Sequence, residues 1–119
     1  MTTPTVLINI NGDIRDAASL TIPPNRAFRN AWQFAGPAVE VDMTKARGIQ
    51  RDRLRAERAG RFAELDSEWF RADEASDAAK KADVAARKKK LRDVTADPRI
   101  EAAATPEALQ ALTLDALTA

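Results

Sequence analysis

Apolar and polar residues alternate with a period of two over the first part of the chain. Thr5–Ile10 is rich in β-branched residues and predicts a strand. The dipeptide Asn11-Gly12 follows at once and favours a tight hairpin, because both central residues of a type I′ turn need a positive φ. We therefore expect a returning strand at Asp13–Asp16, with the strand pattern resuming at Ser19–Ile22.

A second hairpin is predicted around Gly36-Pro37. The segment Phe28–Phe34 places its three aromatic residues on one side of a strand, and Ala38–Val41 resumes a period of two. The first two aromatic residues are four positions apart and could also lie on a short helix, but the Gly-Pro pair favours the hairpin. The first third of the chain is thus expected to form a small antiparallel meander of three or four strands.

From Asp42 onward the spacing of apolar residues becomes helical. Asp42 is a good N-cap, since its carboxylate can accept from the free amides of the first turn. Apolar steps of three or four residues predict one packed face on a helix that runs to about Asp73. The stripe is weak over Met43–Arg61 and strong over Phe62–Trp69, so we expect the first part to be mostly solvated and the firmest packing to lie near the far end. The stripe consists of Met43, Ala46, Gln50, Leu54, Arg58, Phe62, Leu65, Trp69 and Ala72.

A second helix is predicted over about Asp77–Thr95. It is nearly all Ala, Lys, Arg and Asp, residues of mostly high helix propensity, and its alanines permit close approach to the first helix. We expect the two helices to fold back on each other at Asp73–Asp77 as an antiparallel hairpin.

The last segment carries two helix-start signals. Asp97-Pro98 is a cap followed by proline at the first helical position, and Thr105-Pro106 repeats the device. We expect one or two turns after the first signal and a final short helix after the second. This helix can be stable only when it is docked. Its apolar side consists of Leu109 and Leu112 and, less regularly, Leu114 and Leu117.

These patterns predict an α+β fold, with a small N-terminal antiparallel β meander, a long helical hairpin and a short C-terminal helix. The expected divisions are a β-rich unit at 1–42, the hairpin at 43–95 and a helical tail at 96–119. Their formal charges are −1, +5 and −3. A basic middle and an acidic tail favour contact between them or head-to-tail contact between copies.

Composition narrows the function classes. Much of the apolar content is alanine, so the core is expected to be thin and to gain stability from a partner or from self-association. The chain has no cysteine and no histidine. We expect no disulfide, no metal site, no cofactor and no catalytic site, because no nucleophile with a base and no isolated carboxylate pair is visible.

Two further features bear on location. Met1–Ile8 lacks the basic region and apolar run of a secretory signal, so we expect synthesis and folding in a cytoplasm. No stretch approaches the roughly 18 apolar residues of a membrane span.

Two basic clusters suggest nucleic acid as an alternative partner. Arginines recur along Arg51–Arg61, and Arg87–Arg92 is almost wholly basic. Asp52 and Glu57 interrupt the first cluster, and Glu57 stands four residues before Arg61, a spacing that favours ion pairing on one helix. We interpret both clusters as solvated, salt-bridged faces and keep a small nucleic-acid-binding regulator as the alternative function.

The aromatic residues are candidates for contact with a partner protein. The N-terminal trio could be a stacking platform, but the core of the small sheet is the favoured interpretation. Trp69 and Phe70 point about 100° apart on a helix, so one of them is expected to cover the β unit or another subunit. The candidate partner-binding residues are Phe28, Trp32, Phe34, Phe62, Leu65, Trp69, Phe70, Leu109 and Leu112.

The order of parts resembles the small proteins encoded beside tail fibre genes of bacteriophages and prophages, the tail fibre assembly proteins or chaperones. The resemblance covers about residues 28–117. It is carried by Arg-Asp-Arg-Leu-Arg at Arg51–Arg55, Leu-Arg-Asp-Val at Leu91–Val94 and Thr-Pro-Glu-Ala-Leu at Thr105–Leu109. The tail departs from the fibre chaperones, which often finish with an aromatic, proline-rich stretch.

The resemblance implies a non-enzymatic protein that binds a tail fibre or receptor-binding subunit, either as an assembly chaperone or as a structural component of the virion tail. It implies action in the host cytoplasm during assembly or a place on the tail, and the protein could form a homo-oligomer.

Overall fold

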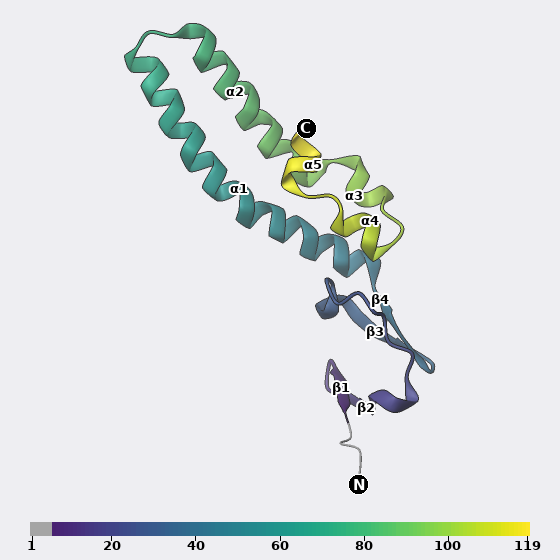
Figure 1. Cartoon of the computed structure of the whole chain (residues 1–119). Helices are drawn as coiled ribbons and strands as arrows, with labels where there is room; N and C mark the ends of the chain where they lie inside the picture. The colour runs from purple at the N-terminus through teal and green to yellow at the C-terminus, as the bar shows by residue number, and fades with distance from the viewer. Residues whose placement is uncertain (1–5) are drawn as a thin grey trace.

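The computed structural model describes residues 6–119 and confirms the α+β fold (Figure 1). Strands occupy one end of an elongated molecule of 72 × 31 × 22 Å, and helices occupy the rest. Met1–Thr5 lie outside the described residues. They include the first residue of the predicted strand and most of the segment that was predicted to lack a secretory signal.

The first predicted hairpin is confirmed. Strands β1 (Leu7–Ile10) and β2 (Asp13–Asp16) pair antiparallel, with Ile10 opposite Asp13 next to the turn. Asn11 and Gly12 have φ of 52° and 88°, as a type I′ turn requires. The predicted continuation at Ser19–Ile22 is wrong, because Ala17–Ser19 form a 3₁₀ turn after which Thr21 makes one isolated bridge with Ala38.

The second hairpin is also present, but it is shorter than predicted. Strands β3 (Trp32–Ala35) and β4 (Ala38–Val41) pair antiparallel, and the two valines of β4 lie opposite Trp32 and Phe34. Phe28 lies outside the strand, because the chain turns through a 3₁₀ helix at Arg29–Ala31. The predicted N-terminal antiparallel strands are thus confirmed, and they form two separate two-stranded sheets.

The helical hairpin is confirmed. Helix α1 (Met43–Glu74) is capped by Asp42, whose Oδ1 accepts from the amides of Thr44 and Lys45 at 3.0 and 3.3 Å. Helix α2 (Ala78–Asp93) runs back along it, with Asp77 as its cap (Figure 1).

The last segment forms three short helices. They are α3 (Pro98–Ala102), α4 (Pro106–Gln110) and α5 (Leu114–Thr118). The predicted single final helix is therefore wrong. It breaks because Thr113 caps α5 and because the Gln50 side chain donates to the Leu112 carbonyl at 2.9 Å.

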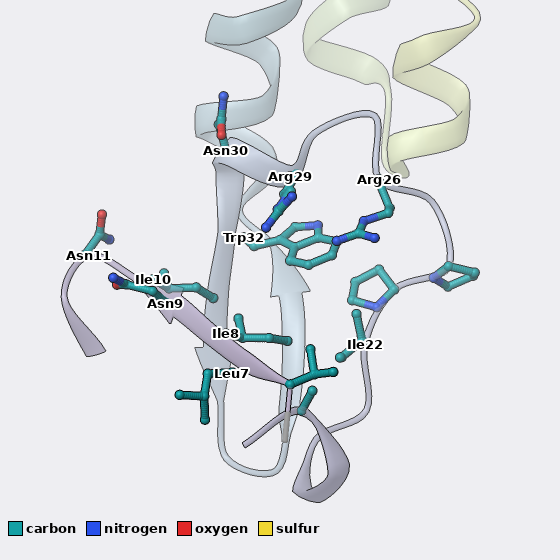
Figure 2. Close-up of a pocket in the computed structure, with 14 residues that line it drawn as sticks. Leu7, Ile8, Asn9, Ile10, Asn11, Ile22, Arg26, Arg29, Asn30 and Trp32 are labelled. Carbon is teal, nitrogen blue, oxygen red and sulfur yellow. The ribbon is translucent and has the colours of Figure 1, made fainter. Parts of the chain in front are cut away.

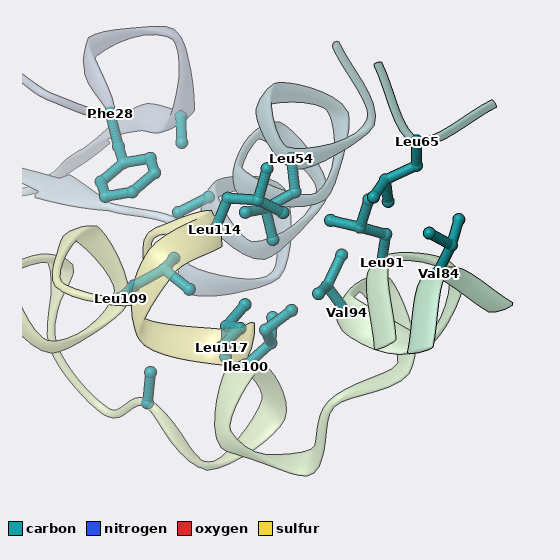
Figure 3. Close-up of a cluster of buried hydrophobic side chains, with 13 residues drawn as sticks. Phe28, Leu54, Leu65, Val84, Leu91, Val94, Ile100, Leu109, Leu114 and Leu117 are labelled. Atoms are coloured by element: carbon teal, nitrogen blue, oxygen red, sulfur yellow. The ribbon is translucent and has the colours of Figure 1, made fainter. Parts of the chain in front are cut away.

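The core lies where the tail covers the first half of α1 (Figures 1 and 3). Leu54 is 1% exposed and Ala46 is fully buried, whereas Phe62 and Trp69 are only half-buried. The expectation of a solvated first half and of firmest packing near Trp69 is thus wrong. The predicted apolar stripe is confirmed, but its spacing does not show that the tail covers the first half of α1. Figure 3 shows the converging side chains of Leu54, Leu91, Val94, Ile100, Leu109, Leu114 and Leu117.

Candidate functional site

Four of the candidate partner-binding residues lie inside the chain's own core. Phe28 and Leu109 are 1% and 0% exposed, and Trp32 and Leu65 are almost as deeply buried. The Arg53 guanidinium lies 4.9 Å from the centre of the Phe28 ring and covers it. A partner cannot reach Phe28, Leu65 or Leu109 without opening the fold.

The other candidates retain accessible surface. Phe34, Phe62, Trp69 and Leu112 are half-buried, and Phe70 is 62% exposed. Trp69 and Phe70 meet edge to face at 5.6 Å in the last turns of α1, and that end of α1 lies far from the strands (Figure 1). Trp69 therefore does not cover the β unit, and Phe70 borders a hollow of about 490 Å³ between α1 and α2.

The first basic cluster is used inside the molecule. Arg51 donates to the Thr95 carbonyl at 3.2 Å and pairs with Glu101, and Arg58 donates to two carbonyls at the end of α2. Arg61 pairs with Asp115, so the expected Glu57–Arg61 pair is wrong. The predicted contact between the basic middle and the acidic tail is confirmed within one chain.

These contacts have a physical logic. Short helices leave carbonyls without partners at their ends, and a buried carbonyl that lacks a donor costs about 1–3 kcal/mol. Arg47 supplies one more donor, to the Ala103 carbonyl at 2.9 Å. Side chains of α1 thus satisfy backbone groups of the tail, and few of these arginines remain for another partner.

The second basic cluster is only partly paired. Arg87 contacts Glu68 at 2.8 Å, and Lys88 contacts Asp66 across the hairpin. Within residues 6–119, Lys89, Lys90 and Arg92 have no ion-pair partner.

The acidic groups with shifted pKa values serve structure. A hydrogen bond from Arg51 holds the pKa of Glu101 below its ordinary value of 4.5. Arg99 does the same for Asp97, whose pKa lies below 3.8 and whose Oδ1 also caps α3. Within the described residues, no acidic cluster could hold a metal ion, and no helix is long and apolar enough to cross a membrane.

The first hairpin differs from most of the molecule, because three large apolar side chains in and next to it are exposed. Val6, Leu7 and Ile14 are 63%, 60% and 56% exposed. Leu7 and Ile14 share one face of the first hairpin, since residues that lie opposite or diagonally opposite each other in an antiparallel pair alternate together. Nothing within residues 6–119 covers this face.

A hollow of about 740 Å³ opens beside β1 (Figure 2). Its walls are residues 6–11, Ala17, Ile22, Pro23, Pro24, Arg26, Arg29, Asn30 and Trp32. We call it the β1 hollow. Its volume lies within the range of about 300–1,000 Å³ that ligand-binding clefts occupy.

Polar groups without partners line the β1 hollow. Figure 2 shows the Trp32 indole between Arg26 and Arg29, and the Arg26 guanidinium lies 5.8 Å from the ring centre. Trp32 Nε1 is buried and has no hydrogen-bond partner within the described part of the chain. Neither arginine forms an ion pair with any of residues 6–119.

Sequence analysis identified Trp32 as a candidate but missed the β1 hollow. Arg26 and Arg29 flank the predicted aromatic strand, and their spacing matches no binding motif. The available signal was Asn11-Gly12, because a tight hairpin that no third strand joins must leave its edges open. Comparison of the chain with protein families, curated proteins and solved structures finds no match.

Proposed function

We propose that the protein is a non-enzymatic, tail-associated phage protein that binds a tail fibre or receptor-binding subunit, as an assembly chaperone or as a structural component of the virion tail. The observation that carries the proposal is the first hairpin. It is a two-stranded sheet with open edges, and Val6, Leu7 and Ile14 are exposed in or next to it. Open edges and exposed apolar side chains favour association with another protein chain.

The resemblance to tail fibre assembly proteins supplies the partner class. The motifs that carry it have structural roles in this chain. Leu54 of the first motif and Leu91 and Val94 of the second are buried in one cluster. Thr105 and Leu109 of the third cap and anchor α4. The motifs thus describe the helical body, and the strand end is left to contact the fibre.

Co-expression with the neighbouring fibre subunit tests the proposal. The tagged protein is expected to co-purify with the fibre subunit and to raise its soluble yield. A protein that stays monomeric and never retains the fibre subunit would contradict it. Binding should persist in the double variant Lys89→Gln/Lys90→Gln, since both lysines are exposed on α2, a helix that lies away from the strands (Figure 1).

The alternative, a small nucleic-acid-binding regulator, rests on Lys89, Lys90 and Arg92 at the end of α2. Electrophoretic shift assays with duplex DNA at 50 and 200 mM salt separate the two functions. Specific nucleic-acid binding through several phosphates weakens steeply over this range. A salt-sensitive shift that K89Q/K90Q removes, without retention of the fibre subunit, would favour the alternative.

A further inference from the structure

We propose that the free edge of β1 and the β1 hollow bind an extended segment of a partner chain, with alternating apolar and acidic residues, as an additional β-strand. The proposal deepens the proposed function, because it names the site and the chemistry of the partner segment. It rests on that function only for the identity of the partner.

The β1 hollow lies along the edge of β1 and not across one face. All six residues from Val6 to Asn11 line it, although successive side chains of a strand point to opposite faces. None of the four β2 residues lines it, and from that side of the hairpin only Ala17, which follows β2 and donates to the Val6 carbonyl, does. Space that touches residues of both faces of β1 and none of the four residues of β2 lies beside the outer edge of β1.

The hydrogen-bond alternation shows which backbone groups point into this space. Ile10 and Asp13 close a two-residue turn and therefore exchange hydrogen bonds. The Ala17 amide donates to the Val6 carbonyl at 2.8 Å, which fits the same alternation. It follows that Leu7 and Asn9 direct their N–H and C=O groups to the outer edge.

Charge specifies the acidic character of the partner. Arg26 and Arg29 line the β1 hollow, and no carboxylate does. Two cations without ion-pair partners in residues 6–119 favour a negatively charged occupant over a neutral or basic one.

The remaining lining specifies apolar residues and length. Ile8, Ile10, Ile22 and Pro23 present apolar surface to the β1 hollow. A strand rises about 3.3 Å per residue, so the edge from Val6 to Asn11 matches a segment of about six residues, roughly 20 Å long. Main-chain hydrogen bonds would hold such a segment, and the arginines would select its sequence.

The test uses a fluorescent, end-blocked nine-residue peptide of alternating valine and glutamate, titrated into the full chain and followed by anisotropy. A peptide of alternating valine and lysine is the charge control. We expect saturable binding of the acidic peptide, at least tenfold weaker binding of the basic one, and weaker binding of the acidic peptide as salt rises. Failure of the acidic peptide to bind, or equal binding of the two, overturns the proposal.

Two matched pairs of variants locate the site. Arg26→Gln/Arg29→Gln should weaken binding about tenfold or more, whereas K89Q/K90Q removes the same charge elsewhere and should stay within about twofold of the parent. Leu7→Pro removes the outward N–H and should abolish binding. Leu7→Ala keeps that N–H and should retain most of the affinity. Equal effects within either pair overturn the proposal.

The outcome remains interpretable if a variant is damaged or if only one proposal fails. Far-ultraviolet circular dichroism and the unfolding midpoint should be unchanged in all four variants, because none of these side chains belongs to the buried cluster. A fibre subunit that co-purifies equally with L7P and L7A, without peptide binding, overturns the edge site and leaves the proposed function standing. Peptide binding without fibre binding supports the edge site and contradicts the proposed function. If the parent chain is a dimer and L7P is a monomer, the edge of β1 mediates self-association, and the proposal of a partner segment is overturned.

Discussion

The two ends of this molecule differ in how their apolar side chains and backbone hydrogen-bonding groups are covered. In the helical end, α1 offers arginines and a glutamine to carbonyls of α2, Thr95 and the tail and to carboxylates of the tail, and leucines from four helices fill the space between. In the strand end, two separate two-stranded sheets leave edges open, and three large apolar side chains are more than half exposed. One end is closed by its own chain, and the other lacks a closing element.

This difference indicates that the helical end determines stability and that the strand end determines binding. No member of the buried cluster comes from β1 or β2 within the described residues. An isolated two-stranded hairpin is marginal in water, so the first hairpin depends on its neighbours or on an added strand. Substitutions in the helical end should therefore change the free energy of unfolding, while substitutions in the strand end should change binding.

The largest expected effect comes from Leu54→Ala. Leu54 is 1% exposed and joins α1 to the tail, so its truncation should lower the free energy of unfolding by about 2–5 kcal/mol. Ile14→Ala, at 56% exposure on β2, should change it by less than about 0.5 kcal/mol. Urea unfolding followed by circular dichroism measures both. Similar losses in the two variants would contradict the division between the ends.

A smaller effect is expected from Arg58→Met. Its Nη1 donates to the carbonyls of Leu91 and Arg92 at 3.2 and 3.1 Å, and the loss of both bonds should cost about 1–2 kcal/mol. Arg55→Met is the matched control, since Arg55 pairs only with exposed Asp52 and should cost less than about 0.5 kcal/mol. The same urea titration compares them. If R55M proved as costly as R58M, the arginines would act through general charge and not through the carbonyls at the end of α2.

Local signals predicted the elements well, because caps and turns depend on neighbouring residues. Asp42 and Asp77 begin α1 and α2, and Asn11-Gly12 forms the expected turn. The helical stripe was also predicted correctly. These features follow from backbone geometry and from a helical period that a single sequence displays.

What the sequence did not reveal depends on contacts between distant segments. The neighbouring residues do not indicate that Gln50 donates to the Leu112 carbonyl at the break in the last helix. They also do not indicate that Arg61 pairs with Asp115 and not with Glu57. The β1 hollow has the same origin, since Arg26 and Arg29 reach β1 only through the tertiary arrangement. Periodicity predicts which face is apolar, but it does not say which segment covers that face.

The smallest expected effect is a pH dependence at the edge of the closed end. Arg51 lowers the folded-state pKa of Glu101 below 4.5, so near that pH the unfolded chain binds more protons than the folded one. The stabilising contribution is therefore complete above pH 4.5 and disappears as pH falls through the lowered pKa. The difference in unfolding free energy between the parent and Glu101→Gln should shrink over this acidic window and remain smaller than the effect of R58M, because Glu101 is exposed. Glu57→Gln controls for net charge, since Glu57 has no ion-pair partner within residues 6–119. A difference between the parent and E101Q that stayed constant from pH 7 to pH 3 would show that the Arg51 contact does not link tail docking to protonation.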